Sequence, residues 1–249
     1  MCENCLGLTW TASGITGSGK SFASRHLTTQ LLHLSSHTKA QRRLSDRITY
    51  LLTLLDSFGS SKTPINPSAS QHGRYFELYF SADGRIAGAK VLPFGLNKSR
   101  LGRLRHEERT FHVFYQLLAG ASPEERDALN LDEPSSYALL SASNCYRLPG
   151  GPFSDDSSQL SELRVAFASL GFKAKHVRSI FTLLTAILFL SNLTFEDNTG
   201  AGLLGMTSMD ERARVTDRQV LVEVAAHLGV GPDELEAVLV NRTSSRLSW

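Results

Sequence analysis

A glycine-rich octapeptide near the start of the chain constrains the fold more than any other stretch. The sequence GITGSGKS, residues 14–21, fits the pattern G-x-x-x-x-G-K-[ST]. Glycines at such positions allow backbone N–H groups to turn inward around an anion, and a following helix adds the positive end of its dipole. The alternating apolar residues of 5–12 predict a strand before the loop, and the leucines of 20–36 predict a helix after it. Strand, loop and helix together are the context that a phosphate-binding loop requires.

Each part of this loop has an expected role. Lys20 would reach the β- and γ-phosphates of a nucleotide, and the Ser21 hydroxyl would ligate Mg²⁺. The alternative is an inherited loop that no longer binds a ligand. We predict that ATP and Mg²⁺ are held by Gly14, Ile15, Thr16, Gly17, Ser18, Gly19, Lys20 and Ser21.

The charge distribution favours an anionic ligand in the N-terminal half. Residues 1–122 carry 15 Lys and Arg against 7 Asp and Glu, a net charge of +8, whereas residues 123–249 carry 11 against 17, a net charge of −6. Nucleic acid is the rival partner for such a half. The chain shows neither a nucleic-acid motif nor a basic run interleaved with aromatic residues, so we expect no nucleic-acid partner.

The cysteine content and the hydropathy pattern favour a cytoplasmic protein without a membrane span. Three cysteines are too few for a disulfide framework, which suggests a reducing compartment. Cys2 and Cys5 form a C-x-x-C pair, but no second pair follows at zinc spacing, so two small apolar residues before a strand are the simpler interpretation. Residues 179–195 are the most apolar segment; they are short for a membrane span and include Ser, Thr and Asn, which predicts a buried core helix.

Periodicity predicts a mixed α/β domain whose C-terminal part is mainly helical. A β-hairpin is expected over 74–94, with Asp83-Gly84 as its turn. Ser122, Pro123 and Glu125 form the start signal of a short helix. Loops are expected at 60–73, 145–158 and 196–213. Further helices are predicted at 42–59, 107–120, 122–130, 158–170, 174–193, 217–230 and 231–243.

Several longer stretches then carry a resemblance along almost the whole chain. The stretch FGSSKTPINPSASQHGRYFELYF (58–80) resembles the part of myosin motor domains that runs into switch I, N-x-x-S-S-R-F-G-K. Residues 84–122 resemble the following hairpin, the K-S-R segment and the E-R-N-F-H-I-F-Y-Q-L-L helix, and residues 180–197 resemble a later apolar helix. The resemblance implies a P-loop NTPase fold of the myosin-motor type, with the phosphate loop, switch I and hairpin in 1–98 and a helical region in 99–249.

Two phrases narrow the resemblance to the degenerate myosin motor-like domain fused to some fungal chitin synthases. GSGKS (17–21) matches the usual loop of that group, and GASPEER (120–126) is typical of it. The resemblance implies ATP or ADP with Mg²⁺ as ligands and a cytoskeleton-associated protein. It also implies actin as a partner of the parent protein, although most of the actin-binding cleft falls outside the match. The parent would then be a membrane protein at sites of cell-wall growth.

Switch I departs from the pattern of a working motor. Asn66 keeps its first position and would contact nucleotide, and Ser70 keeps the serine that would ligate Mg²⁺ beside Ser21. Ala69 replaces the serine whose hydroxyl lies near the γ-phosphate, and Gln71 replaces the arginine that pairs with a switch II glutamate. Phosphoryl transfer relies on positioning and electrostatics, and the loss of one such group often costs about 10²–10³ in rate. We therefore expect weak or absent hydrolysis and assign no catalytic residue.

The extent of the match suggests an incomplete motor domain. We find no switch II motif D-x-x-G-F-E, no converter and no glycosyltransferase region in the 249 residues. The expectation is a truncated gene model, a relic, or one piece of a longer protein, with strand edges left unpaired.

Other interpretations remain open from the sequence alone. A non-catalytic interaction module that no longer uses nucleotide would explain Ala69 and Gln71, whereas an unrelated P-loop kinase would need a second acidic motif, and none is apparent. His112 is expected to be a packed core histidine. A structural linker is expected at Lys98, Ser99 and Arg100, and a solvated helix start at Glu107, Glu108 and Arg109.

Overall fold

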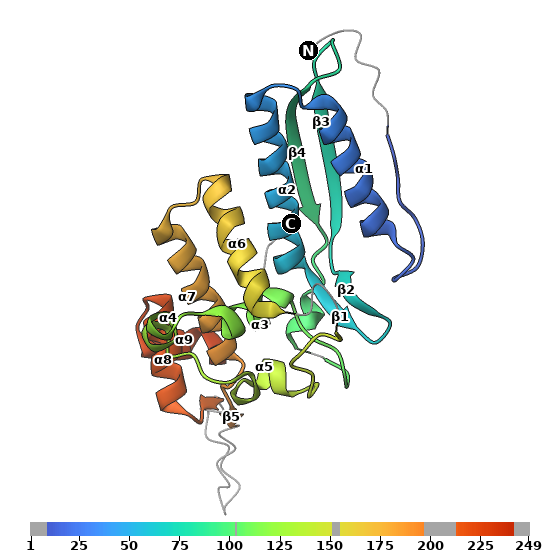
Figure 1. Cartoon of the computed structure of the whole chain (residues 1–249). Coiled ribbons are helices and arrows are strands. Elements are labelled where there is room, and N and C mark those ends of the chain that lie inside the picture. Colours follow the sequence, from blue (N-terminus) through green and yellow to red (C-terminus); the bar gives the residue numbers. More distant parts are fainter. Residues whose placement is uncertain (1–8, 103, 151–154, 197–212, 242–249) are drawn as a thin grey trace, which may run out of the picture.

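The computed structural model describes residues 9–102, 104–150, 155–196 and 213–241. Within them, strands gather in the first half of the chain and helices dominate the second (Figure 1). The strands are β1 (Ser60–Thr63), β2 (Asn66–Ser70), β3 (Gly73–Phe80), β4 (Ile86–Phe94), β5 (Phe195–Glu196) and β6 (Arg214–Val215). The helices are α1 (Lys20–Ser35), α2 (Lys39–Gly59), α3 (His112–Gly120), α4 (Pro123–Leu129), α5 (Ala138–Ser141), α6 (Asp156–Leu170), α7 (Ala174–Leu190), α8 (Arg218–Leu228) and α9 (Pro232–Val240), with 3₁₀ turns η1 (Lys98–Leu101) and η2 (Pro134–Ser136).

The predicted hairpin of 74–94 is confirmed as β3 and β4. The two strands pair antiparallel, and the turn contains Gly84 at φ 74°, a conformation that glycine adopts without steric cost. One face of the hairpin lies against α1 and α2 (Figure 1), where Leu32, Ile48 and Ile86 form a small core. This unit positions the start of α1, at which the phosphate loop ends.

The prediction of a loop over 60–73 is wrong. Residues 60–70 form the β1–β2 hairpin, in which Ser60 pairs with Ser70 and Ser61 with Ala69. The polar composition and two prolines concealed these strands, because their pairing rests on backbone hydrogen bonds rather than on an apolar face. The switch I segment is therefore a strand with a fixed register.

The helical half contains the main core. Helix α6 packs against α2 and α3, and α7 packs against α8. The predicted helix of 174–193 is confirmed as α7, with Phe181 and Leu188 almost fully buried. None of the helices in the described ranges is long and apolar enough to cross a membrane.

Capping residues set several helix boundaries. The start signal of α4 is confirmed: Ser122 and Glu125 form a capping box and Pro123 occupies the first turn. Helix α2 begins three residues before the predicted 42, because Thr38 and Gln41 form a second capping box.

The expected helix over 107–120 starts only at His112, which corrects the view of residues 107–109 as a solvated helix start. The backbone N–H of Arg109 donates to the carbonyl of Lys62 at 3.1 Å, and Phe111 forms a bridge with Ser61. Glu108 is 6% exposed and Arg109 0%. Residues 108–110 therefore extend along β1 and are buried between the hairpin and the helices, whereas Glu107 is exposed as predicted.

Buried Arg109 has two partners for its charge. Its guanidinium donates to Asp156 Oδ1 at 2.8 Å and lies over the Tyr115 ring at 3.8 Å from the centroid. Asp156 begins α6, so this ion pair joins the segment beside β1 to the helical core.

The P-loop NTPase fold implied by the resemblance includes a mixed sheet beside the phosphate loop. Among the described residues, the strands instead form three two-stranded antiparallel sheets. Residues 9–12 of the predicted strand 5–12 form no strand, while residues 5–8 lie outside the described residues, as do Cys2 and Cys5. A strand needs a pairing partner, and apolar alternation alone does not supply one. Of the loops expected at 145–158 and 196–213, residues 151–154 and 197–212 also lie outside them, and α6 already begins at Asp156.

We predict that Asp156→Asn destabilises the chain by about 3–5 kcal/mol, because it leaves the Arg109 cation buried without its counter-charge. Urea unfolding measures the effect, with the exposed Asp127→Asn on α4 as the matched control. Equal stability of the two variants would contradict a structural role for the ion pair.

Candidate functional site

Two glycines of the loop before α1 adopt left-handed backbone conformations. Gly17 and Gly19 have φ of 79° and 86°, in the left-handed region, and Gly19 directly precedes the first turn of α1. The N–H of Ser18 donates to the carbonyl of Ile15 at 3.3 Å, which closes a turn. The loop therefore ends at a helix N-terminus, where free N–H groups and the helix dipole favour an anion.

Lys20 lies over this loop. Its ammonium donates to the carbonyl of Ile15 at 2.5 Å and is 3.4 Å from the Ser18 hydroxyl. The side chain is thus held by groups of the loop that it would leave in order to reach a phosphate.

The two serines predicted to ligate Mg²⁺ lie together. The hydroxyl oxygens of Ser21 and Ser70 are 3.2 Å apart, although the residues are separated by 49 positions. The first turn of α1 supplies one and the end of β2 supplies the other. Mg²⁺ is commonly held by a few protein oxygens together with substrate phosphates, so the pair fits such an ion. Metal binding by the pair stays a prediction.

Asn66 is near the loop but directed into its own turn. Its side-chain oxygen accepts from the N–H of Ser68 at 3.0 Å, and its N–H donates to the Thr63 hydroxyl at 3.1 Å. The adjacent Ile65 carbonyl lies 3.7 Å from the position of a Cβ at Gly17. The structure thus places the β1–β2 turn beside the loop, and the nucleotide contact of Asn66 stays a prediction.

Strand alternation separates Ala69 from its neighbours. Ser68 and Ser70 are exposed, whereas Ala69 is 4% exposed and lies on the opposite face of β2. The methyl group at 69 is thus buried and does not share a face with the Ser70 hydroxyl.

Ser68 contacts the buried His112. The Nε2 atom of His112 is 3.3 Å from the Ser68 hydroxyl. Burial, with a smaller contribution from Arg109, lowers the pKa of His112 from 6.5 to about 3. The ring is therefore neutral near pH 7, and His112 is a core residue as predicted.

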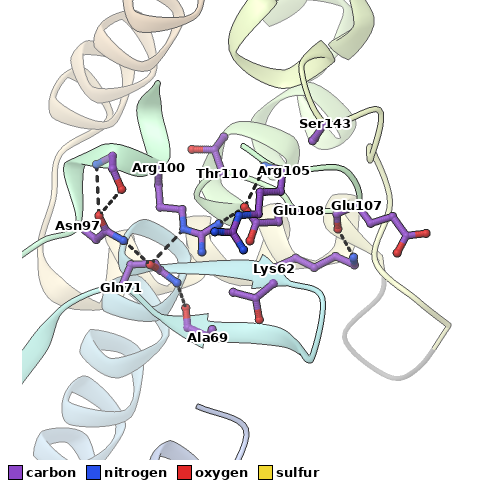
Figure 2. Close-up of polar contacts among 12 residues, drawn as sticks. Lys62, Ala69, Gln71, Asn97, Arg100, Arg105, Glu107, Glu108, Thr110 and Ser143 are labelled. Atoms are coloured by element: carbon purple, nitrogen blue, oxygen red, sulfur yellow. Dashed lines mark hydrogen bonds and ion pairs between the residues drawn. The ribbon is translucent and has the colours of Figure 1, made fainter. Parts of the chain in front are cut away.

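A polar network continues from the far end of β2 (Figure 2). The side-chain oxygen of Gln71 accepts from Asn97 Nδ2 at 3.1 Å and from Arg100 Nε at 3.3 Å. Arg100 Nη1 donates to Glu108 Oε2 at 2.7 Å, and the same oxygen accepts from the N–H of Arg105 at 3.1 Å. Gln71 is thus joined to a buried carboxylate through Arg100.

Sequence reasoning missed this network. Arg100 was expected in a structural linker, and Glu108 was expected in solvent. The sequence feature that could have indicated the network is the K-S-R segment close to a glutamate. Nothing in the spacing indicates which of the charged residues of 100–109 is buried.

Strand β1 of the β1–β2 hairpin is also held, through Lys62. The Lys62 ammonium donates to the carbonyl of Glu107, a residue with φ 63° (Figure 2). The N–H of Glu107 donates to the carbonyl of Ser143 at 3.1 Å. The hairpin is therefore held at both ends by residues 97–108.

The family model of the myosin head (motor domain) matches residues 8–248. The chain belongs to the myosin motor-domain family.

The relatives include both myosins and a chitin synthase. Identity is 33% to the myosin-I heavy chain of Dictyostelium discoideum, over 92% of this chain and 9% of that protein. It is 32% to myosin-2 of Arabidopsis thaliana, over 92% and 18%, and 32% to chitin synthase 8 of Mycosarcoma maydis, over 93% and 11%. The chain thus spans less than a fifth of the length of each of these relatives, and its identity to the chitin synthase equals that to myosin-2.

The lowered pKa of His112 predicts a pH-dependent stability. Between the folded pKa of about 3 and the unfolded value of 6.5, the unfolded state binds more protons, so stability falls as pH decreases below 6.5. From pH 7 to pH 5, we expect His112 to contribute a loss of about 2 kcal/mol. Urea unfolding at both pH values should show this loss reduced in His112→Gln and unchanged in the exposed control His33→Gln. An equal loss in all three proteins would contradict the assignment.

Proposed function

We propose that this chain is the nucleotide-binding part of a myosin motor-like domain and that it binds Mg·ATP or Mg·ADP. The phosphates would lie on residues 14–21, with Lys20 beside them and Asn66 at the edge of the site. The contact of 3.2 Å between the Ser21 and Ser70 hydroxyls supports the proposal most directly, because two distant segments meet where the ion is expected.

Different residues of the proposed site would bind the phosphates and the Mg²⁺ ion. Backbone N–H groups of the loop and of the first turn of α1 would hold phosphate oxygens. The Lys20 ammonium would exchange the Ile15 carbonyl for a phosphate, which is a stronger, charge-assisted partner. Ser21 and Ser70 would offer two neutral oxygens to Mg²⁺, and the ion would add charge stabilisation at the phosphates.

We propose that hydrolysis is slow or absent. Gln71 is neutral and already accepts from Asn97 and Arg100, so it cannot form the charged pair that an arginine forms there. Ala69 carries no hydroxyl, and its side chain is buried. We therefore assign binding residues and no catalytic residue.

We further propose that residues 1–98 carry the nucleotide site and that residues 99–249 form its helical support. In the parent protein this unit would link actin to the placement of chitin synthase at sites of cell-wall growth. The parent would then be cytoplasmic on its motor side and associated with the cytoskeleton. The similarity to both myosins and chitin synthase 8 supports this part of the proposal.

A second candidate is an interaction module without nucleotide. The contact of Lys20 with the Ile15 carbonyl favours this module, because the Lys20 ammonium already has a hydrogen-bond acceptor within the loop. The two candidates differ in what removal of Lys20 does.

We expect the wild-type chain to bind a fluorescent ATP analogue in a Mg²⁺-dependent manner, and Lys20→Ala to bind at least tenfold more weakly because it lacks the charge facing the phosphates. Equilibrium titration with and without Mg²⁺ measures this, with Lys175→Ala on the exposed side of α7 as the matched control. Phosphate release in the same samples should stay near the background rate.

Absence of binding from both wild type and Lys20→Ala would contradict nucleotide binding and favour the interaction module. Equal binding by the two proteins would contradict a phosphate site at Lys20. Mg²⁺-dependent binding with rapid phosphate release would preserve the nucleotide site and refute the expectation of slow hydrolysis.

A further inference from the structure

Gln71 is held at its backbone on both sides. Its N–H donates to the carbonyl of Gly59, where α2 ends, and its carbonyl accepts from the N–H of Asn97, each at 2.8 Å. Ser70 is the preceding residue and the last residue of β2. The position of the Ser70 hydroxyl therefore depends on how residue 71 is held.

The side chain of Gln71 uses both ends of its amide. The oxygen accepts two donors, Asn97 Nδ2 and Arg100 Nε, which fills its two lone pairs. The nitrogen donates to the carbonyl of Ala69 at 3.2 Å, within the same strand. Position 71 thus presents an acceptor to two donors (Figure 2).

The network ends on a buried charge. The Arg100 side chain is 14% exposed and that of Glu108 is 9% exposed, and their ion pair measures 2.7 Å. The Glu108 carboxylate also accepts a hydrogen bond from the N–H of Arg105, which fixes its position. A hydrogen bond in such a site is costly to break, because a group left unpaired loses its solvation as well.

We propose that Gln71 is a positioning residue that holds Ser70 beside Ser21, so that the Mg²⁺ ligand pair is formed before nucleotide arrives. This inference rests on the proposed function, and it assigns Gln71 a role of its own rather than only the loss of an arginine. Preorganised ligands bind more tightly because less ordering remains to be done on binding.

The chemistry at position 71 sets the order of its variants. A glutamate keeps an acceptor towards Asn97 and adds a charge partner for Arg100, and it gives up only the donation to the Ala69 carbonyl. An arginine places donors against two donors and a positive charge beside the Arg100 guanidinium. The positioning role therefore predicts that Gln71→Glu binds Mg·nucleotide as tightly as wild type, and that Gln71→Arg binds it about tenfold more weakly. If Gln71 is only a lost switch I arginine, the opposite order is expected: Gln71→Arg would bind Mg·nucleotide more tightly than wild type.

The test is titration of a fluorescent ADP analogue against wild type, Gln71→Glu, Gln71→Arg and the control Gln219→Arg, which adds the same charge at an exposed site on α8. Each protein is measured with Mg²⁺ and with EDTA. If Gln71 positions a metal ligand, its replacement weakens the Mg²⁺-dependent affinity for nucleotide and leaves the affinity measured in EDTA unchanged. Hydrogen exchange of the same 249-residue proteins, without nucleotide, measures the protection of the backbone N–H groups of Asn97 and Gln71.

Support requires faster exchange of these two amides in Gln71→Arg, together with a selective loss of its Mg²⁺-dependent affinity. Equal or tighter Mg²⁺-dependent binding by Gln71→Arg would overturn the positioning role while leaving the nucleotide site intact. Wild-type protein that binds no nucleotide would overturn both, and unchanged exchange in Gln71→Arg would show that the network does not hold the strand.

Discussion

The buried segment of residues 108–110 is the constraint on which the arrangement of the site depends. Arg109 forms its ion pair with Asp156 at the start of α6, at 2.8 Å, while its backbone N–H donates to Lys62 of β1 at 3.1 Å. Glu108 accepts a hydrogen bond from Arg100, and Arg100 also donates to Gln71, the residue that follows β2. The hairpin that carries Ser70 is therefore fixed to the helical half of the chain through charged groups. Such groups tolerate burial only because each has a partner in place.

This connection gives the helical half a role in holding the proposed nucleotide site. The phosphate loop needs only local sequence to form, because its glycines and the start of α1 determine its shape. The second serine of the proposed metal site is different, since Ser70 reaches Ser21 only if the β1–β2 hairpin has the correct register and position. Helix α6, far from the loop in sequence, thus contributes to the site through Asp156 and Arg109. A fragment limited to residues 1–98 would lack this support.

Local signals made much of the fold predictable. The helices with apolar periodicity and capping residues were predicted to within a few residues, as was the hairpin around Gly84. The β1–β2 hairpin was not, because its residues are polar, include two prolines and owe their pairing to backbone hydrogen bonds. The burial of Arg109 was hidden for another reason: its partner Asp156 is 47 residues away, and no local pattern indicates that the two meet. At the site, the neighbourhood of Ser21 and Ser70 agrees with the family resemblance, whereas the network of Gln71 required the structure.

The central claim is that Ser21 and Ser70 serve one Mg²⁺ ion, and a double-mutant cycle tests it most directly. The Mg²⁺ affinity is measured at saturating nucleotide for wild type, Ser21→Ala, Ser70→Ala and the double variant. Two ligands of one ion, 3.2 Å apart, should show a coupling energy of about 0.5–3 kcal/mol, so that the second substitution costs less than it does in the wild-type background. Additive effects, or an affinity for Mg²⁺ that neither substitution changes, would contradict a shared metal site.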